Sequence, residues 1–484
     1  MDNKIIPQIN PDVRSKTIPR CRELGIIIPT FKQLQEPELI PDSVKEKLPE
    51  IGMQDIDPLN LFRITWKNDV KTGLFGKVNF LEVPPSLSGV KAKIIGLVGK
   101  HFPTGSHKVG AAFGCLVPRL VSGQFDPEVH KAVWPSTGNY CRGGAFDCAL
   151  LKCDAVAILP EEMSQERFRW LKSIGAEVIA TPGCESNVKE IYDKCWELRE
   201  DPSYVIFNQF DEFGNSLYHH HVTGRALEEL LGKNKESSAK LCAFVSATGS
   251  AGTIAAGDYL KTRFPHLKII AAEALQCPTL LMNGFGGHRI EGIGDKHVPW
   301  IHNVRNTDVI TGIDDEDCMR LLRLFNEPAG KKLIASLGIP EGISDNLHLL
   351  GISSICNLLA AIKTAKYFEL NENDVILTVF TDSADLYQTR LQELTDERGV
   401  YKEKDAIRDY AAAIEAQKID YFKELSYYDR KAIHNLKYYT WVEQQGKTYE
   451  EITEQWHPQY WDNIYDEISQ MDELIEAFNH EVGL

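Results

Sequence analysis

The chain has 484 residues and a formal net charge of −16, with 43% hydrophobic and 25% charged residues. This composition is typical of a globular protein, and the length is enough for two or three domains. A strongly acidic chain has no electrostatic attraction for nucleic acid or for an anionic membrane, and no apolar run approaches the roughly 20 residues that span a bilayer. The N-terminal stretch MDNKIIPQINPDVRSK lacks the apolar core of a signal peptide, so we expect a cytoplasmic protein.

Residues 1–80 contain scattered prolines and predict an extension that packs on a core. From Lys91 onward, short apolar runs alternate with amphipathic helical stretches. The expected strands are AKIIGLVG (92–99), AVWPS (132–136), AVAILP (155–160), EVIATPG (177–183), AFVSATG (243–249), KIIAAEA (268–274) and VILTVF (375–380). Expected helices begin at Ser106 and cover 138–152, 164–175 and 254–264. Buried strands interleaved with helices predict a parallel α/β sheet, and such sheets bind ligands beyond the carboxyl ends of their strands.

The end of the chain changes character again. Residues 390–417 form a charged stretch typical of helices, and the segment from LKYYTWVEQQ onward carries many aromatic side chains. We expect this segment to dock on its own core or on a partner subunit, with a lid over the active site as the alternative. The eleven cysteines include no CxxC pair, and Cys148 and Cys153 are poorly spaced for zinc. We therefore expect reduced core cysteines and no metal site.

The first candidate loop, GKHFPTGSHK, ends on Lys108 at the start of an expected helix. Pro103, Thr104 and Gly105 turn the chain, and Ser106 is placed to cap the helix. Burial and the positive end of the helix dipole both lower the pKa of a lysine, and the neutral amine is the form that makes a Schiff base. Pyridoxal phosphate is the commonest aldehyde of this kind. The alternative is a lysine whose ammonium group reaches solvent.

Two further loops follow expected strands and are rich in glycine and hydroxyl side chains. PSTGNYCRGG places Ser136, Thr137, Gly138 and Asn139 at a helix start, which suits either a carboxylate site or an ordinary helix cap. SATGSAGTIAAG, residues 246–257, lies between a strand and a helix, where backbone N–H groups of small residues can surround a phosphate. Similar loops bind dinucleotides, and neither this loop nor GKHFPTGSHK ends in the Gly-Lys-Ser/Thr of a nucleotide-triphosphate P-loop.

Seven motifs occur in a fixed order: TGSHK, STGN, LPEEMSQERFRWLKSIGAEVIATPG, NQFDEFGN, ATGSAGT, EGIG and FTDSADLY. In this order they resemble the cysteine synthase and cystathionine β-synthase branch of the fold-type II pyridoxal-phosphate enzymes, over roughly residues 57–395. The resemblance implies an α/β fold of two three-layer α/β/α domains with mostly parallel sheets. It implies a large cofactor domain formed by residues 81–130 and 235–395, and a small mobile domain, residues 131–234, that carries the STGN loop. It also implies an N-terminal extension over residues 1–80 and a helical C-terminal extension over residues 396–484.

The resemblance also implies roles for individual residues. Lys108 would hold pyridoxal 5′-phosphate as an internal aldimine and remove the α-proton of the substrate as general base. Asn139 would contact the ring hydroxyl oxygen, and Ser383 would face the pyridine nitrogen. The remaining roles are a phosphate loop at Gly249, Ser250, Ala251, Gly252 and Thr253, and a substrate-carboxylate site at Ser136, Thr137, Gly138 and Gln209.

The residue at the pyridine nitrogen bears on the type of reaction. A carboxylate there keeps the nitrogen protonated, whereas the neutral Ser383 hydroxyl leaves it largely unprotonated and favours loss of a β-substituent over aminotransfer. We therefore expect a lyase or synthase that performs β-elimination or β-replacement on cysteine, O-acetylserine or serine, through an aminoacrylate. The alternatives are an ammonia-lyase or dehydratase acting on diaminopropionate, serine or threonine, and a catalytically silent partner subunit, which would not need Lys108. By analogy with the family, we expect a homodimer.

Several residues depart from the family pattern or invite a different role. Tyr140 stands where cysteine synthases usually carry threonine, and GNYCRGGA resembles the GNHGRGVA of diaminopropionate ammonia-lyases. Ala251 replaces a glycine of the phosphate loop, which is tolerable if its φ stays negative. His297 is a candidate substrate contact or a surface histidine, and Glu273 is expected to be structural. The three histidines at 219–221 are not expected to share a metal, because consecutive helical side chains point about 100° apart.

Overall fold

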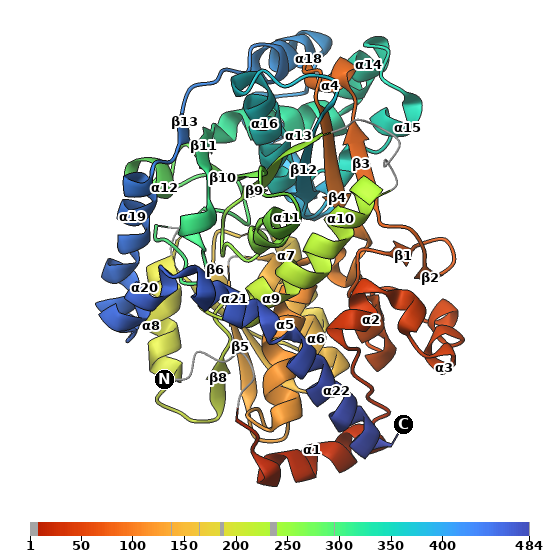
Figure 1. Cartoon of the computed structure of the whole chain (residues 1–484). Helices are drawn as coiled ribbons and strands as arrows, with labels where there is room; N and C mark the ends of the chain where they lie inside the picture. Colours follow the sequence, from red (N-terminus) through yellow and green to blue (C-terminus); the bar gives the residue numbers. More distant parts are fainter. Residues whose placement is uncertain are drawn as a thin grey trace.

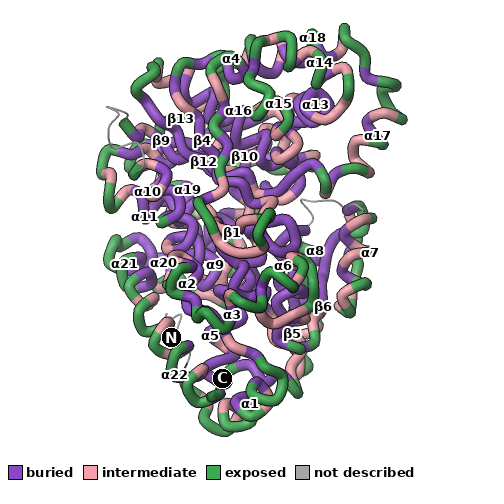
Figure 2. The backbone as a smooth tube through the Cα atoms, turned by 90° about the vertical axis from the view of Figure 1, so that its right-hand side faces the viewer, coloured by how far each residue is buried: buried purple, intermediate pink, exposed green. Residues whose placement is uncertain are grey.

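Two β-sheets organise the chain, and helices surround both of them (Figure 1). The computed structural model describes residues 8–136, 138–163, 165–183, 188–232, 240–294 and 296–483. Most strand residues in both sheets are buried or half-buried, and the exposed positions lie largely on the outer helices and loops (Figure 2). Most neighbouring strands pair parallel, which confirms the expected α/β fold with mostly parallel sheets. A small hairpin of β1 (Asn68–Asp69) and β2 (Leu74–Phe75) lies outside the two sheets.

The larger sheet has seven strands. In spatial order they are β13 (Phe422–Glu424), β11 (Val309–Ile313), β10 (Lys268–Ala274), β9 (Lys240–Ala247), β12 (Asp374–Phe380), β4 (Lys93–Val98) and β3 (Phe80–Val83). The five inner strands are parallel, and the two edge strands, β13 and β3, pair antiparallel. Every residue of β12 is buried, as expected of a parallel strand that is covered on both faces. The sequence pattern missed both edge strands and β11.

The smaller sheet is parallel throughout. In spatial order its strands are β7 (Glu177–Thr181), β6 (Asp154–Pro160), β5 (Lys131–Pro135) and β8 (Tyr204–Ile206). The helices α6 (Asn139–Leu150), α7 (Gln165–Ser173) and α8 (Val188–Leu198) alternate with these strands along the chain. The almost wholly buried α5 (Lys108–Ser122) leads from the larger sheet to the smaller one and packs against α6 and α9 (Phe213–Tyr218).

Helices also cover the larger sheet. The charged stretch 390–417 folds as α17 (Gln388–Arg398), α18 (Glu403–Tyr410) and a π-helical turn (Ala411–Glu415). Gly399 ends α17 with φ 79°, the left-handed conformation that glycine adopts at no steric cost. The other helices around this sheet are α4 (Pro85–Ser88), α10 (Gly224–Gly232), α11 (Ala255–Arg263), α12 (Thr279–Met282), α13 (Asp315–Asn326), α14 (Pro328–Ser336), α15 (Glu341–Ser344) and α16 (Ile352–Tyr367).

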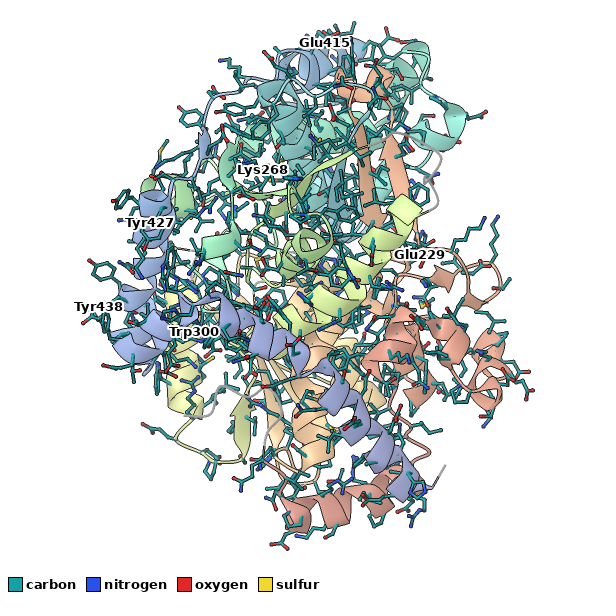
Figure 3. All side chains as sticks on the ribbon, in the orientation of Figure 1. Glu229, Lys268, Trp300, Glu415, Tyr427 and Tyr438 are labelled. Atoms are coloured by element: carbon teal, nitrogen blue, oxygen red, sulfur yellow. The ribbon has the colours of Figure 1, made fainter. Side chains whose placement is uncertain are left out.

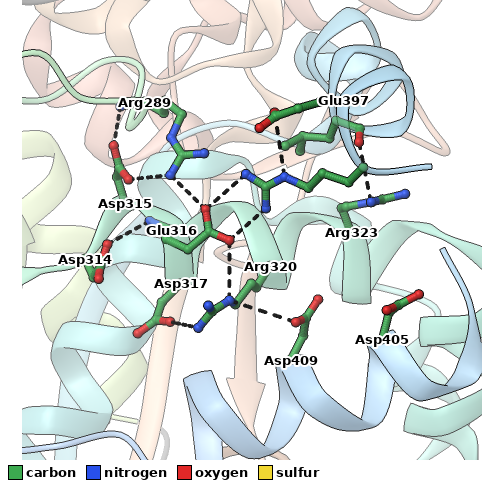
Figure 4. Close-up of polar contacts among 12 residues, drawn as sticks. Arg289, Asp314, Asp315, Glu316, Asp317, Arg320, Arg323, Glu397, Asp405 and Asp409 are labelled. Atoms are coloured by element: carbon green, nitrogen blue, oxygen red, sulfur yellow. Dashed lines mark hydrogen bonds and ion pairs between the residues drawn. The ribbon is translucent and has the colours of Figure 1, made fainter. Parts of the chain in front are cut away.

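An ion-pair network joins α17 and α18 to α13 (Figure 4). Glu316 accepts hydrogen bonds from Arg398 at 2.7 and 3.0 Å and from Arg289 at 2.8 Å. Arg320 pairs with Glu316 at 3.4 Å and lies 3.9 Å from Asp409 of α18. The helices that follow β12 are therefore held to α13 by charge pairs as well as by apolar packing.

The two ends of the chain pack against each other. The N-terminal helices α1 (Pro11–Glu23), α2 (Phe31–Gln35) and α3 (Asp42–Lys45) precede the first sheet strand, and the last helices are α19 (Tyr427–Asn435), α20 (Tyr449–Gln455), α21 (Pro458–Asp466) and α22 (Ile468–Val482). Figure 1 shows α22 beside α1. Asp472 of α22 accepts the backbone N–H of Phe31 at 2.7 Å, and Arg22 donates to the carbonyl of Val482 at 2.6 Å. The aromatic C-terminal segment docks on its own core.

Candidate active site

Lys108 is the first residue of α5 and follows the carboxyl end of β4 after a short irregular connection. Within that connection, Thr104 with φ 66° and Gly105 with φ 73° turn the chain. Ser106 Oγ accepts the backbone N–H of Lys108 at 3.4 Å, but His107 occupies the N-cap position, so the expectation that Ser106 caps the helix is wrong. Lys108 is half-buried, and its Nζ donates to Ser250 Oγ at 3.2 Å. This contact joins two of the predicted motifs.

Two cavities of about 390 and 380 Å³ meet at Lys108. The first is lined by Ser136, Gly138, Asn139, Tyr140, Gln209, Phe210 and Ser250. The second is lined by Ala251, Gly252 and Thr253, together with Ser246, Ala247, Ser353 and Asn357. The predicted lysine, carboxylate site and phosphate loop thus converge around Lys108. Thr137, also predicted to bind substrate, lies outside the described residues.

The predicted phosphate loop, residues 249–253, lies between β9 and α11. Ala251 adopts φ 61°, so the condition under which an alanine is tolerated here without strain, a negative φ, is not met. This conformation costs a residue with a Cβ roughly 1–2 kcal/mol, and the contacts of the preceding residue hold the loop in it. Ser250 accepts hydrogen bonds from Lys108 and from Asn215 Nδ2, the latter at 3.0 Å. Gly252 has no room for a side chain, because a Cβ there would lie 1.9 Å from Asn215 Oδ1.

The predicted carboxylate site is a connected set of hydrogen-bonding groups. Ser136 Oγ accepts the backbone N–H of Gly138 at 3.2 Å and the side-chain N–H of Gln209 at 3.1 Å. Gly138 immediately precedes α6, and a Cβ at this position would lie 2.5 Å from Arg167 Nη1. The glycine therefore lets a guanidinium group pack directly on the loop backbone. Hydroxyl and amide donors at a helix start suit a carboxylate ligand.

Ser383 and Asn139 each carry a buried polar atom with no hydrogen-bond partner among the residues that the structure describes: Ser383 Oγ and Asn139 Oδ1. Asn139 Nδ2 donates to Asp382 Oδ2 at 2.6 Å, and Tyr387 OH donates to the same oxygen at 2.7 Å. Burial raises the pKa of Asp382. Buried polar atoms are normally paired, so the two atoms without a protein partner fit a ligand ring that carries polar atoms of its own.

Sequence reasoning missed a buried ion pair behind the carboxylate site. Arg167 of α7 lies 2.9 Å from Glu291, with 1% and 3% of their side chains exposed. Arg390 of α17 lies 2.9 Å from the other oxygen of Glu291. The two partners belong to the SQER and EGIG motifs, which are far apart in the chain. The motifs were visible in the sequence, but nothing in it indicated that these charges pair.

The remaining candidate residues have structural contacts. His297 is not a surface histidine: its Nε2 lies 3.2 Å from the Tyr192 hydroxyl, its ring packs on Phe210, and burial lowers its pKa to about 3. Glu273 accepts backbone N–H groups from the first turn of α12 at 2.8 and 2.9 Å, as expected of a structural residue.

The histidines at 219–221 have separate partners. His219 contacts Thr223 Oγ1 at 2.9 Å, His220 stacks on the Tyr465 ring, and His221 donates to the Tyr465 carbonyl.

Comparison with known proteins agrees with this geometry. A profile of the family described as "Pyridoxal-phosphate dependent enzyme" matches residues 99–382, which is more than half of the chain. The chain belongs to this family of pyridoxal-phosphate-dependent enzymes. It is 32% identical over 287 residues to a cysteine synthase of Staphylococcus aureus, covering 59% of this chain and 84% of that one. It is 28% identical over 315 residues to the cystathionine beta-synthase of Saccharomyces cerevisiae, covering 63% and 59%.

Solved structures of the same branch share the fold of this pyridoxal-phosphate enzyme. A cysteine synthase from Entamoeba histolytica has a TM-score of 0.57 at 24% identity and covers 69% of this chain and 92% of its own. An O-acetylserine dependent cystathionine beta-synthase from Helicobacter pylori has a TM-score of 0.54 at 25% identity, covering 65% and 95%. The resemblance to the cysteine synthase and cystathionine β-synthase branch is confirmed. Across the described part of this enzyme, no helix combines the length and apolarity needed to cross a membrane.

Proposed function

We propose that this enzyme removes or replaces the β-substituent of a small amino acid, with O-acetylserine, serine and cysteine as the leading substrates. The observation that carries the proposal is Ser383, a buried neutral hydroxyl without a partner among the described residues. It stands where the family pattern places the group that faces the pyridine nitrogen. A neutral group there favours loss of a β-substituent over aminotransfer. The names of the relatives, cysteine synthase and cystathionine β-synthase, support the same substrates.

In the proposed mechanism, bound pyridoxal phosphate supplies an aldehyde for the substrate's amine and a ring that takes up electrons. Ser136, Gly138 and Gln209 orient the substrate through its carboxylate, and the loop at 249–253 holds the phosphate. The Lys108 amine, which lies 3.2 Å from Ser250 Oγ, removes the α-proton as a general base. Closure of the smaller sheet over the pocket would exclude water, as reactive intermediates require.

A panel of amino acids tests this function in the purified holoenzyme. Cysteine, serine, and O-acetylserine with sulfide are each supplied, and release or uptake of sulfide, pyruvate and ammonia is measured. We expect turnover of at least one of the three, and loss of both turnover and the yellow cofactor colour in Lys108→Ala. Lys100→Ala is the matched control, because Lys100 lies on the same connection but pairs with Asp385. A colourless wild type that fails to bind added cofactor would falsify the proposal.

An ammonia-lyase is the second candidate, and Tyr140 is the observation that favours it. This residue belongs to GNYCRGGA and lines the cavity at Lys108, where cysteine synthases usually carry threonine. The tyrosine is fully buried and its ring packs edge-on against Trp134. Ammonia from diaminopropionate, without sulfide from cysteine, would identify this activity in place of the first.

We also propose that the enzyme is a homodimer in the cytoplasm. Exposed aromatic side chains gather on the C-terminal helices, among them Tyr427 and Tyr438 in Figure 3, and Tyr428, Tyr439 and Tyr449 nearby in the chain. Aromatic residues are enriched at protein interfaces. Light scattering is expected to give twice the chain mass of 54.6 kDa, and a monomer mass would contradict the proposal.

A further inference from the structure

A second, larger cavity lies between the smaller sheet and the C-terminal extension. With its open mouth included, it measures about 1360 Å³. Its walls come from α5, β8, the residues that begin α9, the loop around Trp300, and Lys447 of the C-terminal segment. Figure 3 labels Trp300 at the level of α8 and α20. Segments from distant parts of the chain thus enclose one space, which is a common setting for a ligand site.

Opposite charges face each other in this cavity. Glu212 Oε1 lies 2.5 Å from Arg119 Nη2, and Asp211 Oδ2 lies 3.6 Å from Lys447 Nζ. The four side chains are between 18% and 31% exposed, so each charge is partly desolvated and still reaches the cavity. The 3.6 Å between Asp211 and Lys447 is longer than a hydrogen bond, so a ligand can insert between these two side chains without breaking a hydrogen bond. Arg199 adds a further cation at the rim.

The rest of the lining is apolar or aromatic. Lys447 Nζ lies 5.4 Å from the Trp300 ring centroid, and that indole is 2% exposed. Gly114 and Gly214 pack so closely that a Cβ on either would overlap the backbone of the other. Backbone atoms therefore form the cavity wall at these two glycines, and the charged groups of the lining are those of Arg119, Arg199, Asp211, Glu212 and Lys447.

One layer of side chains separates this cavity from the catalytic pocket. Cys115 lines the larger cavity, and its thiol lies beside the hydroxyl of Tyr140, which lines the pocket at Lys108. Similarly, Gln209 and Phe210 line the catalytic pocket, and the next residues of the same segment line the larger cavity. The two sites are adjacent and have distinct linings.

We propose that the larger cavity is a second binding site for a free amino acid, separate from the site at Lys108. A zwitterion matches the lining, since its ammonium group can pair with Asp211 and Glu212 while its carboxylate pairs with Arg119 and Lys447. A simple anion would face two carboxylates, and a simple cation would face three positive groups. Only a ligand with both a positive and a negative group can replace the Asp211–Lys447 and Glu212–Arg119 pairs with equivalent pairs between protein and ligand.

Thermal unfolding of the holoenzyme tests the site, with the common L-amino acids supplied one at a time. The absorbance of the cofactor reports binding at Lys108, and Tm reports binding anywhere. At least one amino acid is expected to raise Tm saturably without changing the cofactor spectrum. Asp211→Asn and Lys447→Met should each weaken that binding about tenfold, the loss of one charge-assisted hydrogen bond. Lys431→Met is the matched control, since Lys431 also lies over a tryptophan ring, at 4.4 Å, outside the cavity.

Three results would overturn the proposal. One is that every amino acid that raises Tm also changes the cofactor spectrum. Another is a Tm shift that is unchanged in both Asp211→Asn and Lys447→Met, or that is lost in the Lys431→Met control to the same extent as in these two variants. The third is an equal Tm shift with succinate or with ethylamine, which carry only one kind of charge. Comparing the shifts rather than the absolute Tm values keeps the test valid when a variant is less stable.

Discussion

At the first turn of α5, Lys108 places a cation where the helix dipole disfavours one. That conflict in the sequence marks the residue as a candidate for Schiff-base chemistry. The structure adds a neighbour for this lysine, because its Nζ donates to Ser250 Oγ of the proposed phosphate loop. Asp382 is the opposite case. Its sequence context gave it no role, yet it accepts hydrogen bonds from both Asn139 and Tyr387, which only the fold brings to it.

The sharpest test at the residue scale is Ser383→Asp. The change places an acidic group at a buried position where the proposed mechanism needs a neutral one. We expect kcat for β-elimination to fall at least about tenfold, which corresponds to about 1.4 kcal/mol of activation free energy. Pyruvate release measures the effect, and Ser383→Ala, which stays neutral, should retain most of the activity. Normal elimination kinetics in the Asp variant would refute the role of this hydroxyl.

Among the elements, α7 and α17 are joined through one carboxylate of the EGIG loop. Glu291 lies between Arg167 of α7 and Arg390 of α17. Arg167 in turn packs against Gly138 of the carboxylate site. The helices can therefore not shift independently of the loops that line the pocket. Helical periodicity predicted α7 from the sequence but said nothing about this pairing.

Glu291→Gln tests the pairing through stability. The variant leaves two arginines, one of them fully buried, without the charge between them. Breaking a buried ion pair typically costs roughly 3–5 kcal/mol, so we expect a clear drop in Tm. Glu393→Gln is the control, because Glu393 pairs with the same Arg390 but is 52% exposed. Exposed pairs contribute roughly 0–1 kcal/mol, so equal losses in the two variants would contradict the assignment.

For the whole molecule, the C-terminal extension is an integral part of the core. Lys437 is fully buried and donates to the carbonyls of Trp300 and His302 at 2.8 and 2.9 Å and to Gln455 at 2.7 Å. Trp441 donates to the carbonyl of Val298 at 2.8 Å. These bonds fix the segment that follows the EGIG loop. The extension thus holds the segment that follows the EGIG loop, two of whose residues, Gly292 and Ile293, line the proposed active site.

The buried histidines under the extension predict acid sensitivity. Burial, with Lys437 nearby, lowers the pKa of His302 to about 3, against about 6.5 in the unfolded chain. Its contribution to stability is therefore complete above pH 6.5 and is lost as the pH falls toward 3. We expect Tm to decline over this range less steeply in His302→Gln than in the wild type. His266→Gln, at an exposed histidine, should follow the wild type, and identical slopes in all three proteins would contradict the prediction.

The sequence by itself determined the alternating strands and helices and the order of the motif loops, and it predicted Lys108 as the lysine that binds the cofactor. These features are local, because apolar periodicity and glycine-rich turns are encoded in short segments. Only the tertiary structure decided what depends on distant residues meeting. Asn215 reaches Ser250, the left-handed Ala251 is held in place, Arg167 meets Glu291, and β13 completes the larger sheet. Side-chain pairing across the fold depends on packing geometry, which a one-dimensional pattern does not contain.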